Sequence, residues 1–366
     1  MPPGEVLSVE FTVQGDVTGS IDRAPTRILA LTLLACTPDF PPEIWSGEHL
    51  VYATDRDDLI CEGSFHLQDR FVAALAELVG VQLEGPVLFV YVEQSRVGDF
   101  CTRDIAAGCA REDAVISTWP VNRHELAHAV TLAAGWRGPA SFVEGIAEVF
   151  NNGTDTVQEQ APLAEVLDSF QITKPHYFTM GRFVRFLIER HDLEAVGAFM
   201  RATEYDDRRV DYEAAFAEHF GEPLSEAVLA FESYPVCAEW SNRIALLECD
   251  SPLAEWQGDT LELTVDVQCD DPGVFGPSGT SLQISAFRAF DVAQEGTYEL
   301  SVESEEDVGV GVRITRCASC WDPLDLGIEA NTKQSLLLPA GRYYATFVAT
   351  TEAPGELRLT MTPTVP

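Results

Sequence analysis

Two histidines separated by three residues, the first of them followed by a glutamate, carry the clearest chemistry in the sequence. The segment is His124-Glu125-x-x-His128, in a stretch with helical periodicity. Residues four apart on a helix lie on one face, one turn apart, so both imidazoles can reach one metal ion. Glu125 stands beside them and can accept a proton from a water that the metal activates, without being a ligand. The motif gives the hypothesis of a hydrolytic metal site.

A catalytic tetrahedral site also needs a third protein ligand and an open position for water. Glu144 lies 16 residues after His128, in the helical pattern Ser141–Phe150, and a turn in the gap would let two helices run antiparallel. Glu144 is therefore the expected third ligand. The alternative is that Ser141-x-x-Glu144 is a helix-capping box. Glu148 either orients a ligating histidine or is solvated.

The pattern His124-Glu-x-x-His128 followed by Glu144-Gly-x-Ala-Glu148 resembles the gluzincin clan of zinc metallopeptidases, in the peptidase-MA-like group. The resemblance implies one catalytic Zn²⁺ held by His124, His128 and Glu144. It also implies Glu125 as the general base in peptide-bond hydrolysis by zinc-activated water. It covers roughly residues 49–240 and implies a zincin-like catalytic domain, with a mixed α/β first half and a mainly helical second half. It says little about the substrate.

Two further residues are candidates for stabilising the tetrahedral oxyanion, which needs a donor besides the metal. His176 and Tyr177 follow Pro175 and precede a helix expected to begin near Phe178, so a rigid loop could aim them inward. The stretch from Tyr177 onward is also similar to the helix that follows in gluzincins. The alternative is that Tyr177 is ordinary core and His176 an exposed loop residue.

The elements expected around these residues are mixed. Apolar residues at helical spacing predict a helix over about 65–79, and Pro86–Val92 predicts a buried strand. Residues 120–240 have mostly helical patterns. The fold class expected for the chain is α+β.

The sequence pattern changes near residue 255. Alternating segments such as Leu261–Val267 and Thr297–Val302 follow one another between Gly and Pro turns, which is typical of an all-β, jelly-roll-like sandwich. This part resembles the pre-peptidase sandwich domains appended to secreted bacterial peptidases. The expected division is a signal segment at 1–36, the metallopeptidase domain at 37–250 and the sandwich at 255–366.

The N-terminal residues resemble an export signal. Arg23 and Arg27 precede an apolar run at 28–35, and the ending Leu33-Leu-Ala-Cys36 resembles a bacterial lipobox, which implies lipid attachment at Cys36. Ordinary secretion and a short buried segment with a structural cysteine are the alternatives. The expected location is the bacterial outer membrane or periplasm, with secretion otherwise.

Cysteine usage supports export. The chain has nine cysteines, and setting Cys36 aside leaves eight, enough for four disulfides in an oxidising compartment. Cys101–Cys109 and Cys317–Cys320 are plausible local pairs. The second pair could instead be half of a zinc ribbon or a redox motif.

The net charge limits the classes of partner that the chain is expected to bind. Acids outnumber bases 59 to 23, for a formal charge of −36, which argues against nucleic acid or an anionic membrane as the main partner. A peptide or protein substrate is expected, with neutral or basic peptides favoured, and membrane contact only through a lipid at Cys36. The function hypotheses are an exported zinc metallopeptidase, a catalytically inactive zincin-fold envelope module that binds, and a zinc hydrolase that is not proteolytic.

Overall fold

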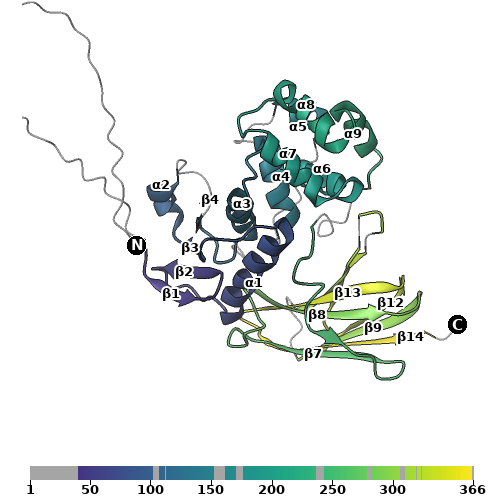
Figure 1. Ribbon diagram of the computed structural model, residues 1–366. Helices are drawn as coiled ribbons and strands as arrows, with labels where there is room; N and C mark the ends of the chain where they lie inside the picture. Colours follow the sequence, from purple (N-terminus) through teal and green to yellow (C-terminus); the bar gives the residue numbers. More distant parts are fainter. Residues whose placement is uncertain are drawn as a thin grey trace, which may run out of the picture. The chain divides into compact units, whose positions relative to one another are not determined.

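The computed structural model describes residues 40–101, 107–111, 113–151, 161–169, 176–235, 243–277, 282–305, 310–318, 320–322 and 324–364 (Figure 1). The predicted signal segment 1–36, with Cys36, lies outside the described residues. Residues 38–366 form one compact unit. Its fold class is α+β, as predicted, with a helix-rich part followed by two β-sheets. None of the described helices is long and apolar enough to cross a membrane.

A five-stranded mixed sheet begins the helix-rich part. Its strand order is β1-β2-β3-β5-β4, in which β2, β3 and β5 are parallel and the two outer strands antiparallel. The strand predicted at Pro86–Val92 forms as β3. Tyr52 and Phe89 are fully buried, and they pack among the core residues that include Phe71 of α1. The elements are β1 (Glu43–Ser46), β2 (Leu50–Thr54), α1 (Glu62–Val79), β3 (Val87–Tyr91), β4 (Gly108–Ala110) and β5 (Ala114–Ser117).

The helices that follow pack around a buried aromatic cluster. Phe142 contacts Phe183, Phe199, Tyr212 and Phe216, with ring centroids 4.8–6.5 Å apart. Burial of large aromatic rings is the main stabilising contribution that such a cluster makes. The helices are α2 (Val97–Phe100), α3 (Arg123–Ala133), α4 (Ala140–Phe150), α5 (Leu163–Ser169), α6 (Tyr177–Arg190), α7 (Leu193–Ala202), α8 (Arg209–Phe220) and α9 (Leu224–Phe231), with a 3₁₀ turn, η1 (Gln94–Arg96), before α2.

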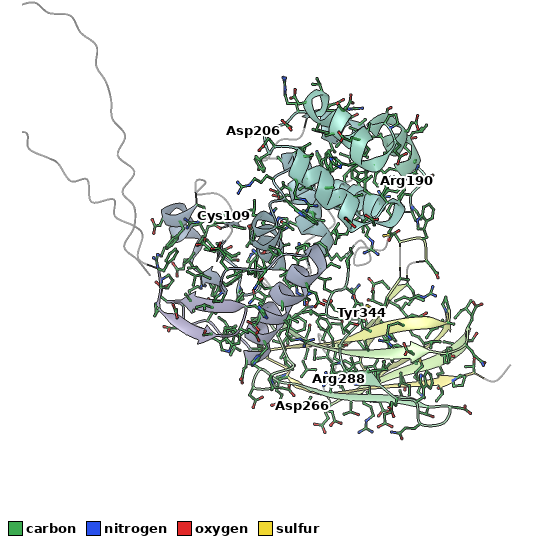
Figure 2. All side chains as sticks on the ribbon, in the orientation of Figure 1. Cys109, Arg190, Asp206, Asp266, Arg288 and Tyr344 are labelled. Carbon is green, nitrogen blue, oxygen red and sulfur yellow. A yellow bond between two sulfur atoms is a disulfide. The ribbon has the colours of Figure 1, made fainter. Side chains whose placement is uncertain are left out.

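The C-terminal part has two sheets, with orders β11-β10-β13-β8-β6 and β12-β9-β14-β7. Along β7 buried and exposed residues alternate strictly, and the exposed Asp266 is labelled in Figure 2. This period of two is what a strand with one buried face requires. The sandwich-like arrangement predicted from the sequence is therefore present. The strands are β6 (Leu253–Ala254), β7 (Leu261–Val267), β8 (Gln283–Val292), β9 (Gly296–Ser304), β10 (Gly311–Arg316), β11 (Asp325–Glu329), β12 (Thr332–Leu338), β13 (Gly341–Thr350) and β14 (Gly355–Pro363).

Three disulfides join described cysteines: Cys61–Cys269, Cys101–Cys109 and Cys249–Cys317. The predicted Cys101–Cys109 pair is confirmed, whereas the predicted Cys317–Cys320 pair is wrong. The Cys317 amide donates to the Arg342 carbonyl, and Arg342 Nη1 donates to the Cys249 carbonyl, so the sandwich brings Cys317 to Cys249. Disulfides of this number are typical of an extracellular or periplasmic protein.

Candidate metal centre

Helix α3 follows strand β5 in the chain and is fixed to its end. Asn122 caps the helix, because its Oδ1 accepts a hydrogen bond from the Glu125 amide at 3.1 Å. Its Nδ2 donates to Ser117 Oγ, in the last residue of β5. Leu126 and Val130, on another side of α3, are fully buried. The first turn of α3, which carries His124 and Glu125, is thus fixed to the sheet and to the core.

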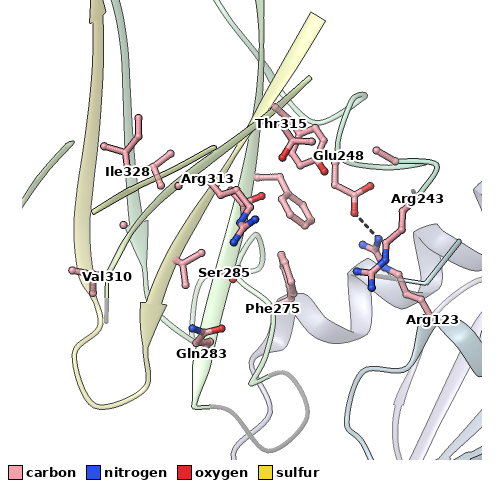
Figure 3. Close-up of a pocket in the computed structure, with 18 of the residues that line it drawn as sticks. Arg123, Arg243, Glu248, Phe275, Gln283, Ser285, Val310, Arg313, Thr315 and Ile328 are labelled. Atoms are coloured by element: carbon pink, nitrogen blue, oxygen red, sulfur yellow. Dashed lines mark hydrogen bonds and ion pairs between the residues drawn. The ribbon is translucent and has the colours of Figure 1, made fainter. Parts of the chain in front are cut away.

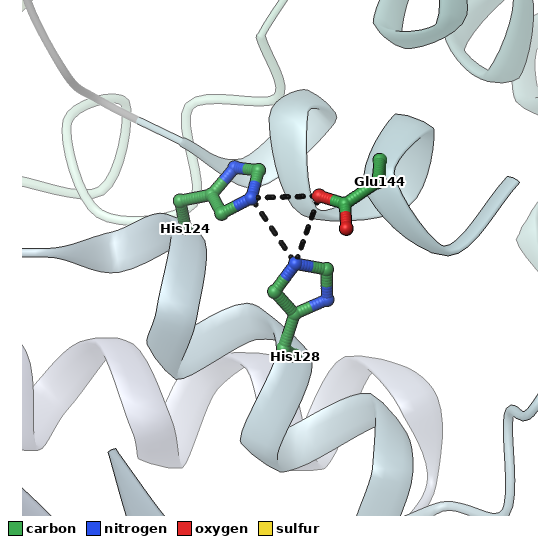
Figure 4. A group of neighbouring side chains, drawn as sticks. All are labelled: His124, His128 and Glu144. Atoms are coloured by element: carbon green, nitrogen blue, oxygen red, sulfur yellow. Dashed lines mark hydrogen bonds and ion pairs between the residues drawn. The ribbon is translucent and has the colours of Figure 1, made fainter. Parts of the chain in front are cut away.

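Helix α4 brings the third side chain to this turn. Its N-cap is Pro139, so the capping box considered for Ser141 and Glu144 does not form. The helix crosses α6 closely: a Cβ on Gly145 would lie 2.7 Å from Val184 Cγ2. With α4 in this place, Glu144 points at the histidines of α3 (Figure 4).

The three side chains converge on one point. His124 Nε2 lies 3.1 Å from His128 Nε2 and 3.1 Å from Glu144 Oε2, and the third side of the triangle, from His128 Nε2 to Glu144 Oε2, is 3.2 Å (Figure 4). The side chains are 10–13% exposed, so the site is shielded but reachable. These residues form a group that can hold a metal ion. The sequence predicted the same three.

The triangle fits a cation better than mutual hydrogen bonds. Each imidazole Nε2 has one hydrogen or one lone pair in the ring plane, so it can serve only one of its two neighbours well. In a tetrahedral site with metal–ligand bonds of about 2.0–2.1 Å, the ligand atoms lie about 3.3 Å apart, close to the spacing found here. Two imidazoles and one carboxylate are also a common donor set of catalytic zinc sites.

The charges of the group favour a positive ion at this point. Burial by itself would raise the pKa of Glu144, but His128 and His124 outweigh it and lower that pKa well below its ordinary value. Burial would lower the pKa of His124, whereas Glu144 and Glu148 raise it well above its usual range. Positive charge is therefore stabilised where the three ligand atoms meet.

A second layer of contacts lies behind His124. Glu148 Oε2 is 3.6 Å from His124 Nδ1 and accepts a hydrogen bond from Asn151 Nδ2 at 3.1 Å. Arg243 Nη2 lies 3.8 Å from the other carboxylate oxygen of Glu148. A carboxylate at Nδ1 orients a ligating imidazole and directs its Nε2 outward. Of the two interpretations of Glu148, the structure thus favours the orienting one over the solvated one.

Glu125 lies beside the triangle, next to strand β4. Its side chain meets Gly108 so closely that a Cβ there would be 3.1 Å from Glu125 Oε1 and 2.7 Å from the Ile116 carbonyl oxygen. Burial raises the pKa of Glu125, against the opposing effect of the two histidines. Nothing in the sequence marks Gly108, because a glycine carries no signal of its own for a contact with a side chain from another element.

The two oxyanion candidates differ in their surroundings. The ring of Tyr177 lies edge-on to His124, with centroids 5.5 Å apart. Burial and then the charges of Glu144, Glu125 and Glu148 raise the Tyr177 pKa, so this phenol faces the acidic side of the site. His176 is the N-cap residue of α6, and no described contact joins it to the triangle. Of the two candidates, Tyr177 is the one with a described contact to the candidate centre.

Comparison with known proteins leaves the family open. No protein-family model matches the chain, and no curated protein does. Among solved structures, the pre-peptidase C-terminal domain of a collagenase from Bacillus anthracis matches with 14% identity and a TM-score of 0.21, over 28% of this chain and 87% of that one. PliG of Salmonella Typhimurium, a periplasmic inhibitor of g-type lysozyme, matches with 14% identity and a TM-score of 0.20, over 31% and 97%.

A third match is the hydroxypropylphosphonic acid epoxidase of S. wedmorenis, with 11% identity and a TM-score of 0.16, over 50% of this chain and 97% of the epoxidase. TM-scores at this level support no conclusion about function.

Proposed function

We propose that the chain is an exported zinc-dependent peptidase. The observation that carries the proposal is the convergence of His124 Nε2, His128 Nε2 and Glu144 Oε2 within 3.1–3.2 Å of one another, beside the half-buried Glu125. His124, His128 and Glu144 would hold one zinc ion, with Glu148 orienting His124. Bound zinc would supply a Lewis acid that activates water and polarises a carbonyl group.

Glu125 is the general base in this proposal. Its carboxylate takes a proton from the attacking water and returns a proton to the leaving nitrogen, so it shuttles one proton across the site. Tyr177 is the second donor. Its hydroxyl would donate a hydrogen bond to the oxygen that becomes negative as the carbonyl is attacked.

Strand β4 supports a peptide as the substrate. It is the last strand in the order of the five-stranded sheet, and Gly108 in it touches Glu125. An extended peptide can add to the edge of a sheet through main-chain hydrogen bonds. A peptide laid along β4 would therefore pass beside Glu125 with its carbonyl groups near the metal ligands.

A compartment outside the cytoplasm also fits the proposed peptidase. The three disulfides would form outside the cytoplasm, where peptides and unfolded proteins of the envelope or the surroundings are available as substrates. Lipid attachment at Cys36 would keep the enzyme at the membrane. The formal charge of −36 favours neutral or basic substrates, because acidic peptides would be repelled.

The test is cleavage of a peptide library by the zinc-loaded protein and by the Glu125→Gln variant. We expect cleavage by the wild type and a loss of about 10²–10⁴-fold in the variant, with zinc content and fold retained. Cleavage that survives Glu125→Gln would remove the base from the mechanism. Zinc binding without any cleavage would instead favour the inactive binding module.

A further inference from the structure

The segment Arg243–Ser251 lies between the last helix, α9, and the first strand of the sandwich, β6. Its end is tied to the sandwich, because Cys249 forms the disulfide to Cys317 just after β10. Its start is tied to α4, because the Ile244 amide donates to the Val149 carbonyl at 2.8 Å. Two residues of this segment, Glu248 and Arg243, contact neighbours of the candidate metal ligands.

The first point is a buried ion pair. Arg123 Nη1 lies 2.5 Å from Glu248 Oε1, and the two side chains are only 4% and 3% exposed (Figure 3). Glu248 is held in turn by its own neighbours, since the Leu247 amide donates to its Oε2 and Ser251 Oγ donates to its carbonyl. Removing one partner of such a pair leaves an uncompensated buried charge, so separating Arg123 from Glu248 is costly.

Arg123 is the first residue of α3 and directly precedes His124. Asn122 already fixes this turn to the sheet through its cap, and Glu248 adds a second contact to the turn through Arg123. Arg123 also stacks on Phe71 of α1, with the guanidinium carbon 5.3 Å from the ring centroid. The backbone that carries His124 and Glu125 is thus held between the sheet, α1 and the segment.

The second point is Arg243, which lies 3.8 Å from Glu148 Oε1, while Glu148 Oε2 lies 3.6 Å from His124 Nδ1. Arg243 and Arg123 lie on the same wall of a cavity of about 900 Å³, whose other wall is formed by sandwich strands (Figure 3). The segment Arg243–Ser251 therefore acts on His124 in two ways. Glu248 holds the backbone next to His124 through Arg123, and Arg243 holds Glu148 near the His124 ring.

We infer that Glu248 and Arg243 are positioning residues of the metal centre, so the segment that leads into the sandwich sets the affinity and geometry of the bound metal. The inference rests on the proposed function in that it takes His124, His128 and Glu144 as metal ligands. It adds that the sandwich, through Cys249–Cys317 and this segment, is part of what holds those ligands in place.

The test compares metal binding in four proteins: wild type, Arg243→Met, Glu248→Gln and the double variant Arg123→Met/Glu248→Met. The double variant is included because Glu248→Gln leaves Arg123 buried without its partner and can fail to fold. Zinc affinity is measured by chelator competition, and the ligand geometry by the visible spectrum of the Co²⁺ form. We expect the affinity to fall at least about 10-fold, as is common when outer contacts of a metal ligand are removed, with a shifted Co²⁺ spectrum.

Glu189→Gln is the matched control. Glu189 also ties the sandwich to a helix, since its Oε1 accepts from the Cys320 amide and from Arg185, with its side chain 12% exposed, but it belongs to α6 and none of its described contacts is with the triangle. This variant should lose stability and keep the zinc affinity and Co²⁺ spectrum of the wild type.

Wild-type affinity and an unchanged spectrum in folded Arg243→Met and in the folded double variant would overturn the positioning role, with the zinc site itself intact. An equal loss of affinity in Glu189→Gln would also overturn it, because the effect would then be one of general stability. Zinc bound normally but no peptide cleaved would overturn only the proposed peptidase. No metal bound by the wild type would overturn both.

Discussion

Glu144 Oε2 lies 3.1 Å from His124 Nε2, although 20 residues separate them along the chain. Two local features produce this contact. The turn after α3 sends α4 back alongside it, and the cap by Asn122 sets the rotation of the first turn of α3. The contact places a carboxylate oxygen at the point where the two imidazole Nε2 atoms meet.

The first prediction concerns Glu144 as a ligand. Glu144→Ala should leave the two histidines without the third protein ligand and lower zinc affinity sharply. The loss should exceed the range of about 10–100-fold that is typical when a residue contacting a ligand is removed. Isothermal titration with zinc under chelator competition measures this. Glu148→Ala serves as the comparison, because it removes an orienting contact and should cost less affinity than Glu144→Ala. A larger loss for Glu148 would reverse the two roles.

The second prediction concerns Gly108. Gly108→Ala places a methyl group 2.7 Å from the Ile116 carbonyl oxygen of β5 and 3.1 Å from Glu125 Oε1, so β4 must shift from β5 and Glu125 must give by a few tenths of an ångström. Peptidase activity should fall by at least about 10²-fold, since small displacements of a catalytic group are costly. Zinc content should stay at the wild-type level. Gly85→Ala is the control, because a Cβ there meets nothing within 4 Å.

Tyr177 and His176 give a third prediction. Tyr177→Phe keeps the ring beside His124 and removes only the hydroxyl, so kcat should fall by about 10²–10³-fold with little change in zinc affinity. His176→Ala should change kcat far less. Steady-state kinetics on one peptide substrate separates the two. The opposite order would assign the oxyanion donor to His176.

The fourth prediction concerns the long-range disulfide. Cys61 and Cys269 are 208 residues apart, so their bond constrains much of the unfolded chain. Replacing both with serine should lower the free energy of unfolding by about 2–5 kcal/mol. The Cys101–Cys109 bond closes a separation of only 8 residues, so its removal should cost less. Thermal unfolding of the two double variants makes the comparison, and an equal loss would contradict the chain-entropy argument.

The parts of the centre that the sequence predicted are those set by local geometry. His124 and His128 share a face because a helix has about 3.6 residues per turn, and Glu144 follows from a helix–turn–helix pattern. Alternation along β7 predicted a sandwich strand because successive side chains of a strand point to opposite faces of the sheet. The resemblance to gluzincins added roles for these residues, and those roles remain predictions.

What the sequence could not predict are contacts between distant segments. Glu248 reaches Arg123 across 125 residues, and no periodicity or motif marks either of them. Cys317 pairs with Cys249 and not with Cys320, because strand pairing in the sandwich decides which thiols meet. The sequence offered both Tyr177 and His176 and favoured Tyr177 only slightly, whereas the contact of its ring with His124 is a feature of the folded chain.

The proposed function requires a metal ion bound by His124, His128 and Glu144. The decisive measurement is the zinc content of the protein from residue 37 onward, folded oxidatively and purified without a histidine tag or chelator, beside that of its His128→Ala variant. We expect about one zinc ion per wild-type chain and almost none in the variant. A wild type without zinc, or a variant that retains it fully, would contradict the proposed centre.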